Sequence, residues 1–167
     1  MTGVILHPHA KINLTLEVLG KRDDGYHEIA TILQTVDLHD TLTMEPAEAI
    51  SLECDRPELE SPDNLALGAA HLLKDRVTSK GGARIRLGKK IPVSAGLGGG
   101  SSDAAAALTG LNQIWDLALE IGELREVASG LGSDVAFFLS GGTALAEGRG
   151  EVISPLPSLP GMPVLLV

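Results

Sequence analysis

The chain has 167 residues, a formal net charge of -9, a hydrophobic fraction of 44% and aromatic residues at only 2%. This length fits one domain with an aliphatic core, and the acidic balance argues against a nucleic acid or an anionic membrane as partner, because either needs a basic surface. The single Cys54 excludes an internal disulfide, which favours a cytoplasmic protein.

The first third of the chain predicts an antiparallel meander. Apolar and polar residues alternate from Ile12 to Val18, which is typical of a half-buried strand. Asp24–Gly25 is a turn signal of the kind that closes a hairpin. We expect strands at residues 10–20, 30–38, 40–46 and close to 50–53.

Helical and strand patterns then alternate. Apolar residues at helical spacing predict a helix over residues 64–76, with Ser61 or Asp63 as its N-cap. Ala83, Ile85 and Leu87 alternate with polar residues and predict a strand within residues 81–92. Further expected elements are a helix from about Ser102, a helix within 118–132, and a turn, a short apolar segment and a hairpin within 133–156.

These elements indicate an α+β fold. The last segment, residues 157–167, is rich in proline and ends on the apolar run VLLV, which we expect to begin a new strand. We therefore assign residues 1–160 to one domain and residues 161–167 to the start of a connection to a further domain.

A glycine run before a helix is the clearest chemical signal in the sequence. Glycines allow positive φ and a close approach of phosphate, and the helix start directs free N–H groups and the positive end of the helix dipole to the same place. The run lacks the Gly-Lys-Ser/Thr ending of a Walker A loop, and its surroundings do not fit a dinucleotide-binding βαβ unit. The residues that we expect to cradle phosphate are Pro92, Gly96, Leu97, Gly98, Gly99, Gly100, Ser101 and Ser102.

Three separate segments resemble the GHMP kinases. PVSAGLGGGSSDAA (residues 92–105) resembles the second motif of that superfamily. AKINLTLEVLGKRDDGYHEI (10–29) and GSDVAFFLSGGTALAEGRGE (132–151) resemble blocks of one branch, whose substrate is an alcohol linked to cytidine diphosphate in the non-mevalonate isoprenoid pathway. The resemblance implies the α+β N-terminal domain of the superfamily, which is similar to the second domain of ribosomal protein S5.

The resemblance assigns catalytic roles to Lys11 and Asp134. Asp134 is expected to act as the general base on the acceptor hydroxyl, and Lys11 to stabilise charge on the hydroxyl and on the transferred phosphoryl group. Asn13 lies two residues after Lys11, on the same strand face, and is expected to contact the substrate. From the residues alone, Lys11 and Asn13 could equally be a solvent-facing polar pair, and Asp134 a turn or helix cap.

Tyr26 and His27 are the residues that the resemblance places at the cytosine. Tyr26 is expected to stack on the ring, which is worth about 1–3 kcal/mol per base in nucleic-acid complexes, and His27 to hydrogen-bond its edge. Asn64 and Lys90 are expected near the nucleotide, although a polar helix start and a loop lysine explain them nearly as well. In the absence of a family, Tyr26 is simply the aromatic residue of a hairpin.

ATP and Mg²⁺ are the expected cofactors, because phosphoryl transfer from ATP almost always uses the metal to bridge phosphates. Either Ser101 or Ser102 could face the metal. His7, His9, His39 and His71 show no metal-ligand spacing, and we interpret them as incidental.

The expected activity is transfer of the γ-phosphoryl group of ATP to a hydroxyl of a small cytidine diphosphate compound. Two alternatives remain open, another GHMP kinase with a different alcohol acceptor and a domain that binds nucleotide without turnover. We expect this chain by itself to bind ATP weakly and to show little kinase activity.

Overall fold

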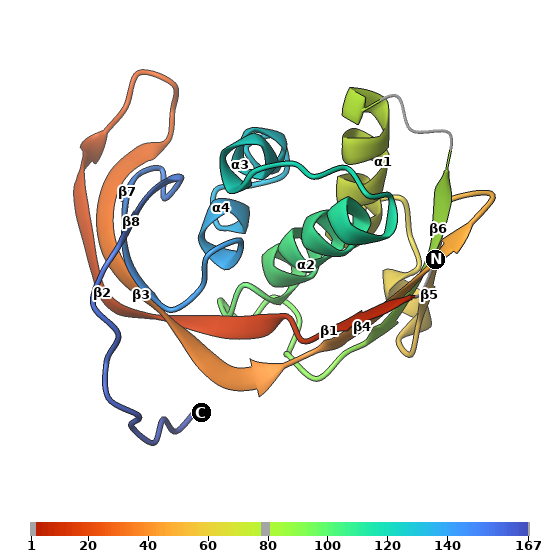
Figure 1. Ribbon diagram of the computed structural model, residues 1–167. Coiled ribbons are helices and arrows are strands. Elements are labelled where there is room, and N and C mark those ends of the chain that lie inside the picture. Colours follow the sequence, from red (N-terminus) through yellow and green to blue (C-terminus); the bar gives the residue numbers. More distant parts are fainter. Residues whose placement is uncertain (1–2, 78–80, 167) are drawn as a thin grey trace.

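The computed structural model describes residues 3–77 and 81–166, which form two four-stranded sheets with the helices gathered on one side (Figure 1). The strands are β1 (Val4–Leu6), β2 (His9–Lys21), β3 (His27–His39), β4 (Thr41–Ala47), β5 (Ser51–Cys54), β6 (Gly82–Gly88), β7 (Thr143–Gly148) and β8 (Val152–Pro155). The helices are α1 (Leu65–Val77), α2 (Gly99–Ile114), α3 (Ile121–Ala128) and α4 (Val135–Phe138), with a 3-10 turn η1 (Pro57–Leu59).

The first sheet has the order β1-β4-β6-β5, in which β5 runs parallel to β6 and the other pairs are antiparallel. The second sheet is antiparallel throughout, in the order β2-β3-β7-β8. The expected hairpin at Asp24–Gly25 is confirmed, since it joins β2 to β3 and Gly25 has a φ of +86°. The α+β class is confirmed as well.

The predicted continuous meander is wrong at Asp40, where the chain passes from one sheet to the other. Strands β3 and β4 follow each other directly but belong to different sheets. The backbone N–H of Asp40 donates to Pro8 O, and its carboxylate accepts the N–H groups of Lys90 and Ile91. These bonds connect three distant segments at one point, so the polypeptide turns here instead of pairing back on β3.

The main core lies between the first sheet and helices α1 and α2, and it is aliphatic as expected. Leu42, Met44 and Ile85 from the sheet and Leu108 and Leu111 from α2 are fully buried. Helix α2 can pack this close because Gly110 faces the sheet, where an added Cβ would lie 2.5 Å from the sulfur of Met44. Burial of each large aliphatic side chain contributes about 1.5–3 kcal/mol, so this layer holds the helix that carries the glycine run.

Helices α1, α2 and α3 each differ in detail from the expected helix. Helix α1 agrees closely with the predicted 64–76, but its cap is Asn64 and neither Ser61 nor Asp63, since Asn64 Oδ1 accepts the N–H groups of Ala66 and Leu67. The helix expected within residues 118–132 is shorter and consists of α3 alone. It begins with a capping box, in which the side chain of Glu120 accepts the N–H of Glu123 and the side chain of Glu123 accepts the N–H of Glu120. Helix α2 starts at Gly99, three residues before the predicted start.

Two further expectations about strands are corrected. Strand β2 exists, but Leu14, Leu16 and Val18 are exposed rather than half-buried, since residues 13–21 of this strand are exposed on both faces. The predicted terminal strand is wrong for residues 157–166, which form no strand; Val167 lies outside the described residues. Prolines at 157, 160 and 163 remove N–H donors that a ladder would need. No helix among the described residues has the length and apolar character to cross a membrane.

Candidate active site

The glycine run forms the turn into helix α2, and its geometry requires glycine at two positions. Gly98 precedes the helix with a φ of +70°, in the left-handed region that favours glycine. A Cβ there would lie 2.7 Å from the ring of Phe138 and 3.2 Å from Cγ of Lys11. At Gly99 a Cβ would lie 2.9 Å from Ile91, so the first turn of α2 rests directly on its neighbours.

A cavity of about 320 Å³ opens above this turn, within the range of roughly 300–1,000 Å³ that is usual for small-molecule sites. The free N–H groups at the start of the 16-residue α2 make this end of the helix suited to an anion. Ser101 lines the cavity, whereas Ser102 is only 3% exposed and lines a different one. The expected phosphate residues that line the cavity are Pro92, Gly96, Leu97, Gly98, Gly99, Gly100 and Ser101.

Lys11 is held at the edge of this loop by both its backbone and its side chain. Its N–H donates to Leu97 O at 2.9 Å, which ties β2 to the glycine run. Its ammonium donates to Asn13 Oδ1 at 2.8 Å, and Asn13 Nδ2 donates to Thr31 Oγ1 at 2.7 Å. Because the Thr31 hydroxyl donates to Thr15 O, it can only accept from Asn13, and the amide oxygen of Asn13 therefore faces Lys11.

Asp134 completes a cation–carboxylate pair with Lys11. Its Oδ2 lies 3.6 Å from Lys11 Nζ, and the side chain of Lys11 is 10% exposed whereas that of Asp134 is 37% exposed. Asp134 directly precedes α4, yet its side chain forms no capping hydrogen bond there. The capping interpretation is thus unsupported, and the carboxylate faces solvent beside a nearly buried ammonium, where an incoming hydroxyl can reach it.

A second, buried charge cluster lies beneath the glycine turn. The ammonium of Lys89 donates to the carboxylates of Asp40 and Asp103, and all three side chains are almost fully buried. A Cβ on Gly99 would lie 3.2 Å from this ammonium, so the cation sits directly against the first turn of α2. Asp103 Oδ1 is buried and has no hydrogen-bond partner among the described residues.

This cluster shifts the protonation of its members. Burial raises the pKa of Asp103 from 3.8 to about 7, although the charge and hydrogen bond of Lys89 act in the opposite direction. Burial alone would lower the pKa of Lys89, but Asp103 and Asp40 together raise it above its ordinary value. The ammonium therefore remains charged at neutral pH, while Asp103 exchanges its proton near neutrality.

Tyr26 and His27 lie at the tip of the β2–β3 hairpin, away from the glycine turn in sequence. The ring of Tyr26 is exposed, and the guanidinium of Arg149 lies 4.9 Å from its centroid. Gly150, the next residue, approaches the Lys11–Asp134 pair, because a Cβ on it would lie 3.9 Å from Asp134 Oδ1. The β7–β8 turn thus connects the aromatic residue to the carboxylate.

Asn64 and Lys90 were both expected near the nucleotide, but only Asn64 lines the cavity. Asn64 lines the cavity, but its amide oxygen caps α1 and its Nδ2 donates to Leu59 O at 3.0 Å. Lys90 is exposed and does not line the cavity, whereas Lys89 does. Lys89 and Asp40 have no distinctive local pattern, and no role was expected for Asp103 or Arg149, although they lie inside the segments 92–105 and 132–151.

Comparisons with known proteins agree with this geometry. Residues 64–142 match the family described as "GHMP kinases N terminal domain". The chain is 52% identical over 168 residues to 4-diphosphocytidyl-2-C-methyl-D-erythritol kinase of Synechococcus sp. strain JA-2-3B'a(2-13), covering 99% of this chain and 54% of the relative. It is 54% identical over 160 residues to the protein of that name from Listeria monocytogenes serotype 4a, with 94% and 55% covered. The chain therefore spans about half the length of the curated relatives it matches.

Solved structures give the same picture. A crystal structure of 4-(cytidine 5'-diphospho)-2C-methyl-D-erythritol kinase superposes with a TM-score of 0.79 at 42% identity, covering 92% of this chain and 55% of that one. The mevalonate kinase of Methanococcus jannaschii superposes with a TM-score of 0.70 at 16% identity, over 94% and 56% of the two chains, and indicates the shared fold alone.

Proposed function

Because the chain carries the N-terminal domain of the GHMP kinases, we propose that it is the catalytic part of an enzyme that transfers the γ-phosphoryl group of ATP to the 2-hydroxyl of 4-diphosphocytidyl-2-C-methyl-D-erythritol. The observation that carries this proposal is the pairing of Lys11 and Asp134 beside the glycine turn. The reaction belongs to non-mevalonate isoprenoid synthesis, and we place it in the cytoplasm, where the free thiol of Cys54 stays reduced.

In the proposed mechanism the oxygen of the acceptor hydroxyl attacks the γ-phosphorus while Asp134 accepts the hydroxyl proton, and the bond between the γ-phosphorus and the departing ADP breaks. Lys11, 3.6 Å from the carboxylate, stabilises negative charge on the attacking oxygen and on the transferred group. Asn13 keeps the ammonium of Lys11 in position through the hydrogen bond to its amide oxygen. General base catalysis by a positioned carboxylate contributes typically about 10²–10⁴-fold to the rate.

ATP is proposed to place its phosphates over the N-terminus of α2, where the glycines leave room and the free N–H groups donate. The Ser101 hydroxyl is the one that lines this cavity, so it is the serine available to a phosphate oxygen or to metal-bound water. Bound Mg²⁺ would neutralise phosphate charge. The cytosine is proposed to stack on the exposed ring of Tyr26, with His27 at its edge, which selects this acceptor over simpler alcohols.

Phosphorylation assays test the proposal on this chain and on a form extended to the full length of its relatives. We expect the extended form to phosphorylate 4-diphosphocytidyl-2-C-methyl-D-erythritol in preference to mevalonate, homoserine or galactose. Asp134→Asn should lower kcat by about 10²–10⁴-fold while ATP affinity changes less than about twofold. Faster turnover of an alcohol without cytidine would refute the substrate, and full activity of Asp134→Asn would refute the base.

A further inference from the structure

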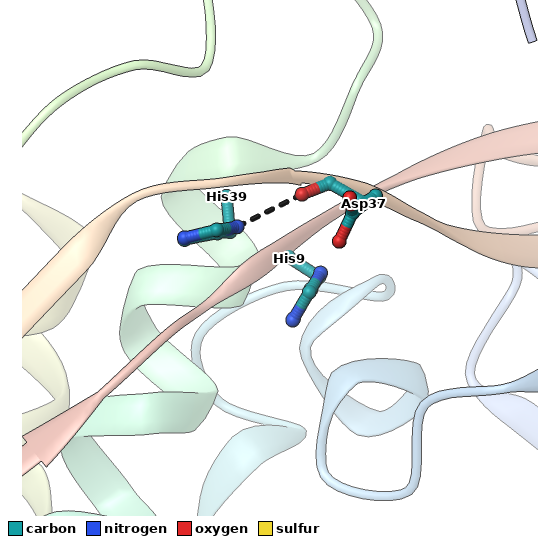
Figure 2. A group of neighbouring side chains, drawn as sticks. All are labelled: His9, Asp37 and His39. Atoms are coloured by element: carbon teal, nitrogen blue, oxygen red, sulfur yellow. Dashed lines mark hydrogen bonds between the residues drawn. The ribbon is translucent and has the colours of Figure 1, made fainter.

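Three imidazoles and a carboxylate gather where the start of β2 meets the end of β3. His9 pairs directly with His39 across the antiparallel ladder, so their side chains lie on the same face of the sheet. Asp37 precedes His39 by two residues, in the part of β3 where the register with β2 shifts. Figure 2 shows the three side chains close together where the two strands meet, with the ring of His39 hydrogen-bonded to the backbone of Asp37. They come together only through the strand register, which is why the sequence analysis interpreted these histidines as incidental.

We propose that His9, Asp37 and His39 form a binding site for a divalent transition-metal ion of the Zn²⁺ type. When one possible ligand atom is taken from each residue, the three atoms all lie within 4.8 Å of one another. A tetrahedral ion with bonds of about 2.0–2.1 Å holds its ligands roughly 3.4 Å apart. The site therefore closes by about 1 Å, which rotations of side chains near the surface can supply.

The hydrogen bonds define the donor state of the two rings. His9 Nδ1 lies 2.9 Å from Val36 O, and His39 Nδ1 lies 2.8 Å from Asp37 O. A carbonyl oxygen only accepts, so Nδ1 carries the proton in each ring and Nε2 holds the lone pair of the neutral form.

Both rings must reorient when an ion binds. In Figure 2 the second nitrogen of each ring points away from the carboxylate of Asp37, so the rings turn about their Cβ–Cγ bonds, and His39 gives up its hydrogen bond to Asp37 O. That loss favours a dissociation constant on the order of micromolar over the tighter binding of fully preformed sites. The carboxylate of Asp37 is free to bind, because it has no hydrogen bond or ion pair among residues 3–77 and 81–166.

The donor set selects the class of ion. Two imidazole nitrogens and one carboxylate oxygen suit Zn²⁺, Ni²⁺ or Cu²⁺, whereas Mg²⁺ and Ca²⁺ prefer oxygen ligands alone. His7 adds a third imidazole, since its ring stacks edge-on against His39 with centroids 5.0 Å apart. This site is separate from the Mg–ATP cavity, because none of its residues lines that cavity.

Calorimetric titration of the metal-free chain with ZnCl₂ tests the proposal. We expect one Zn²⁺ per chain, and at least a tenfold weaker affinity in His9→Gln, Asp37→Asn and His39→Gln. His71→Gln, on the exposed side of α1, is the matched control and should bind like the wild type. Circular dichroism shows whether each variant is folded, and Asp37→Asn, which removes only an exposed charge, keeps the test valid if a histidine variant unfolds.

A second measurement separates a defined site from loose surface binding. Co²⁺ substituted for Zn²⁺ should give the intense visible absorption of a four-coordinate ion, and excess Mg²⁺ should leave it unchanged. Binding weaker than about millimolar, a Zn²⁺ affinity that survives all three substitutions, or an equal loss in His71→Gln would overturn the proposal. None of these results depends on kinase activity, so they leave the proposed function untouched.

Discussion

The glycine turn offers a sharp quantitative test at Gly98. Alanine at this position must adopt a φ of +70°, which costs about 1–2 kcal/mol for a residue with a Cβ. The Cβ also falls 2.7 Å from the ring of Phe138 and 3.2 Å from Lys11, and overpacking of this kind typically costs a further 1–3 kcal/mol or so. We therefore expect Gly98→Ala to lower the free energy of unfolding by about 2–5 kcal/mol.

The chain supplies a matched control for the contact. Gly96 has a φ of +74°, but a Cβ there would meet nothing within 4 Å. Gly96→Ala should therefore show only the backbone cost, about 1–2 kcal/mol. The difference between the two variants isolates the contact with Phe138 and Lys11, and it should be about 1–3 kcal/mol.

Urea denaturation followed by circular dichroism measures both free energies, and calorimetric titration with an ATP analogue measures binding in the folded variants. Because the new Cβ pushes against Lys11, Gly98→Ala should also weaken nucleotide binding more than Gly96→Ala does. If the two variants lose equal stability, within about 0.5 kcal/mol, the close packing of the turn against Lys11 and Phe138 does not exist as described.

Three further predictions concern residues that the sequence alone treated weakly or missed. Asn64→Ala should destabilise the chain by about 1 kcal/mol in urea denaturation, because it removes the cap of α1, and Asn64→Asp should retain most of that stability. The pKa of Asp103 is raised from 3.8 to about 7, so the folded chain binds more protons than the unfolded chain between these two pH values. The free energy of unfolding should therefore fall as pH rises from about 4 to 7, by on the order of a few kcal/mol. If the difference in unfolding free energy between wild type and Asp103→Asn does not change with pH over this range, the assignment is contradicted. Lys89→Met leaves two buried carboxylates without their cation and should cost about 3–5 kcal/mol, whereas Lys90→Met, at an exposed side chain, should change the unfolding free energy by less than about 0.5 kcal/mol.

The sequence predicted those parts of the site that lie in contiguous, chemically distinctive segments. The glycine run and the alternation around Lys11 each follow from local rules of turn, helix and strand geometry. Asp134 needed the family resemblance, because an aspartate before an apolar segment is more often a cap. In the structure this side chain forms no capping hydrogen bond and lies beside Lys11, which supports the proposed role.

What the sequence did not predict depends on long-range pairing. Lys89, Asp40 and Asp103 meet across separations of 49 and 14 residues, and no local pattern predicts that they are in contact. The same reason hides the approach of His9 to His39, which the β2–β3 register alone determines. The transfer of the chain between sheets at Asp40 was missed because two strands that follow each other usually pair.

The order of strands in the second sheet also has a consequence for the kinetics of folding. Strands β2 and β3 form a local hairpin, but β7 joins β3 only by closing a very long loop, as the hydrogen bond between Thr143 and Gln34 across 109 residues shows. Closing such a long loop reduces the conformational entropy of the chain before the new contacts stabilise it, so these contacts form slowly. The segment that carries Asp134 leads directly into β7, and Lys11 lies on β2. Lys11 and Asp134, the two proposed catalytic groups, therefore come together only when the slow, nonlocal half of the sheet has assembled, so the candidate site forms at the end of folding.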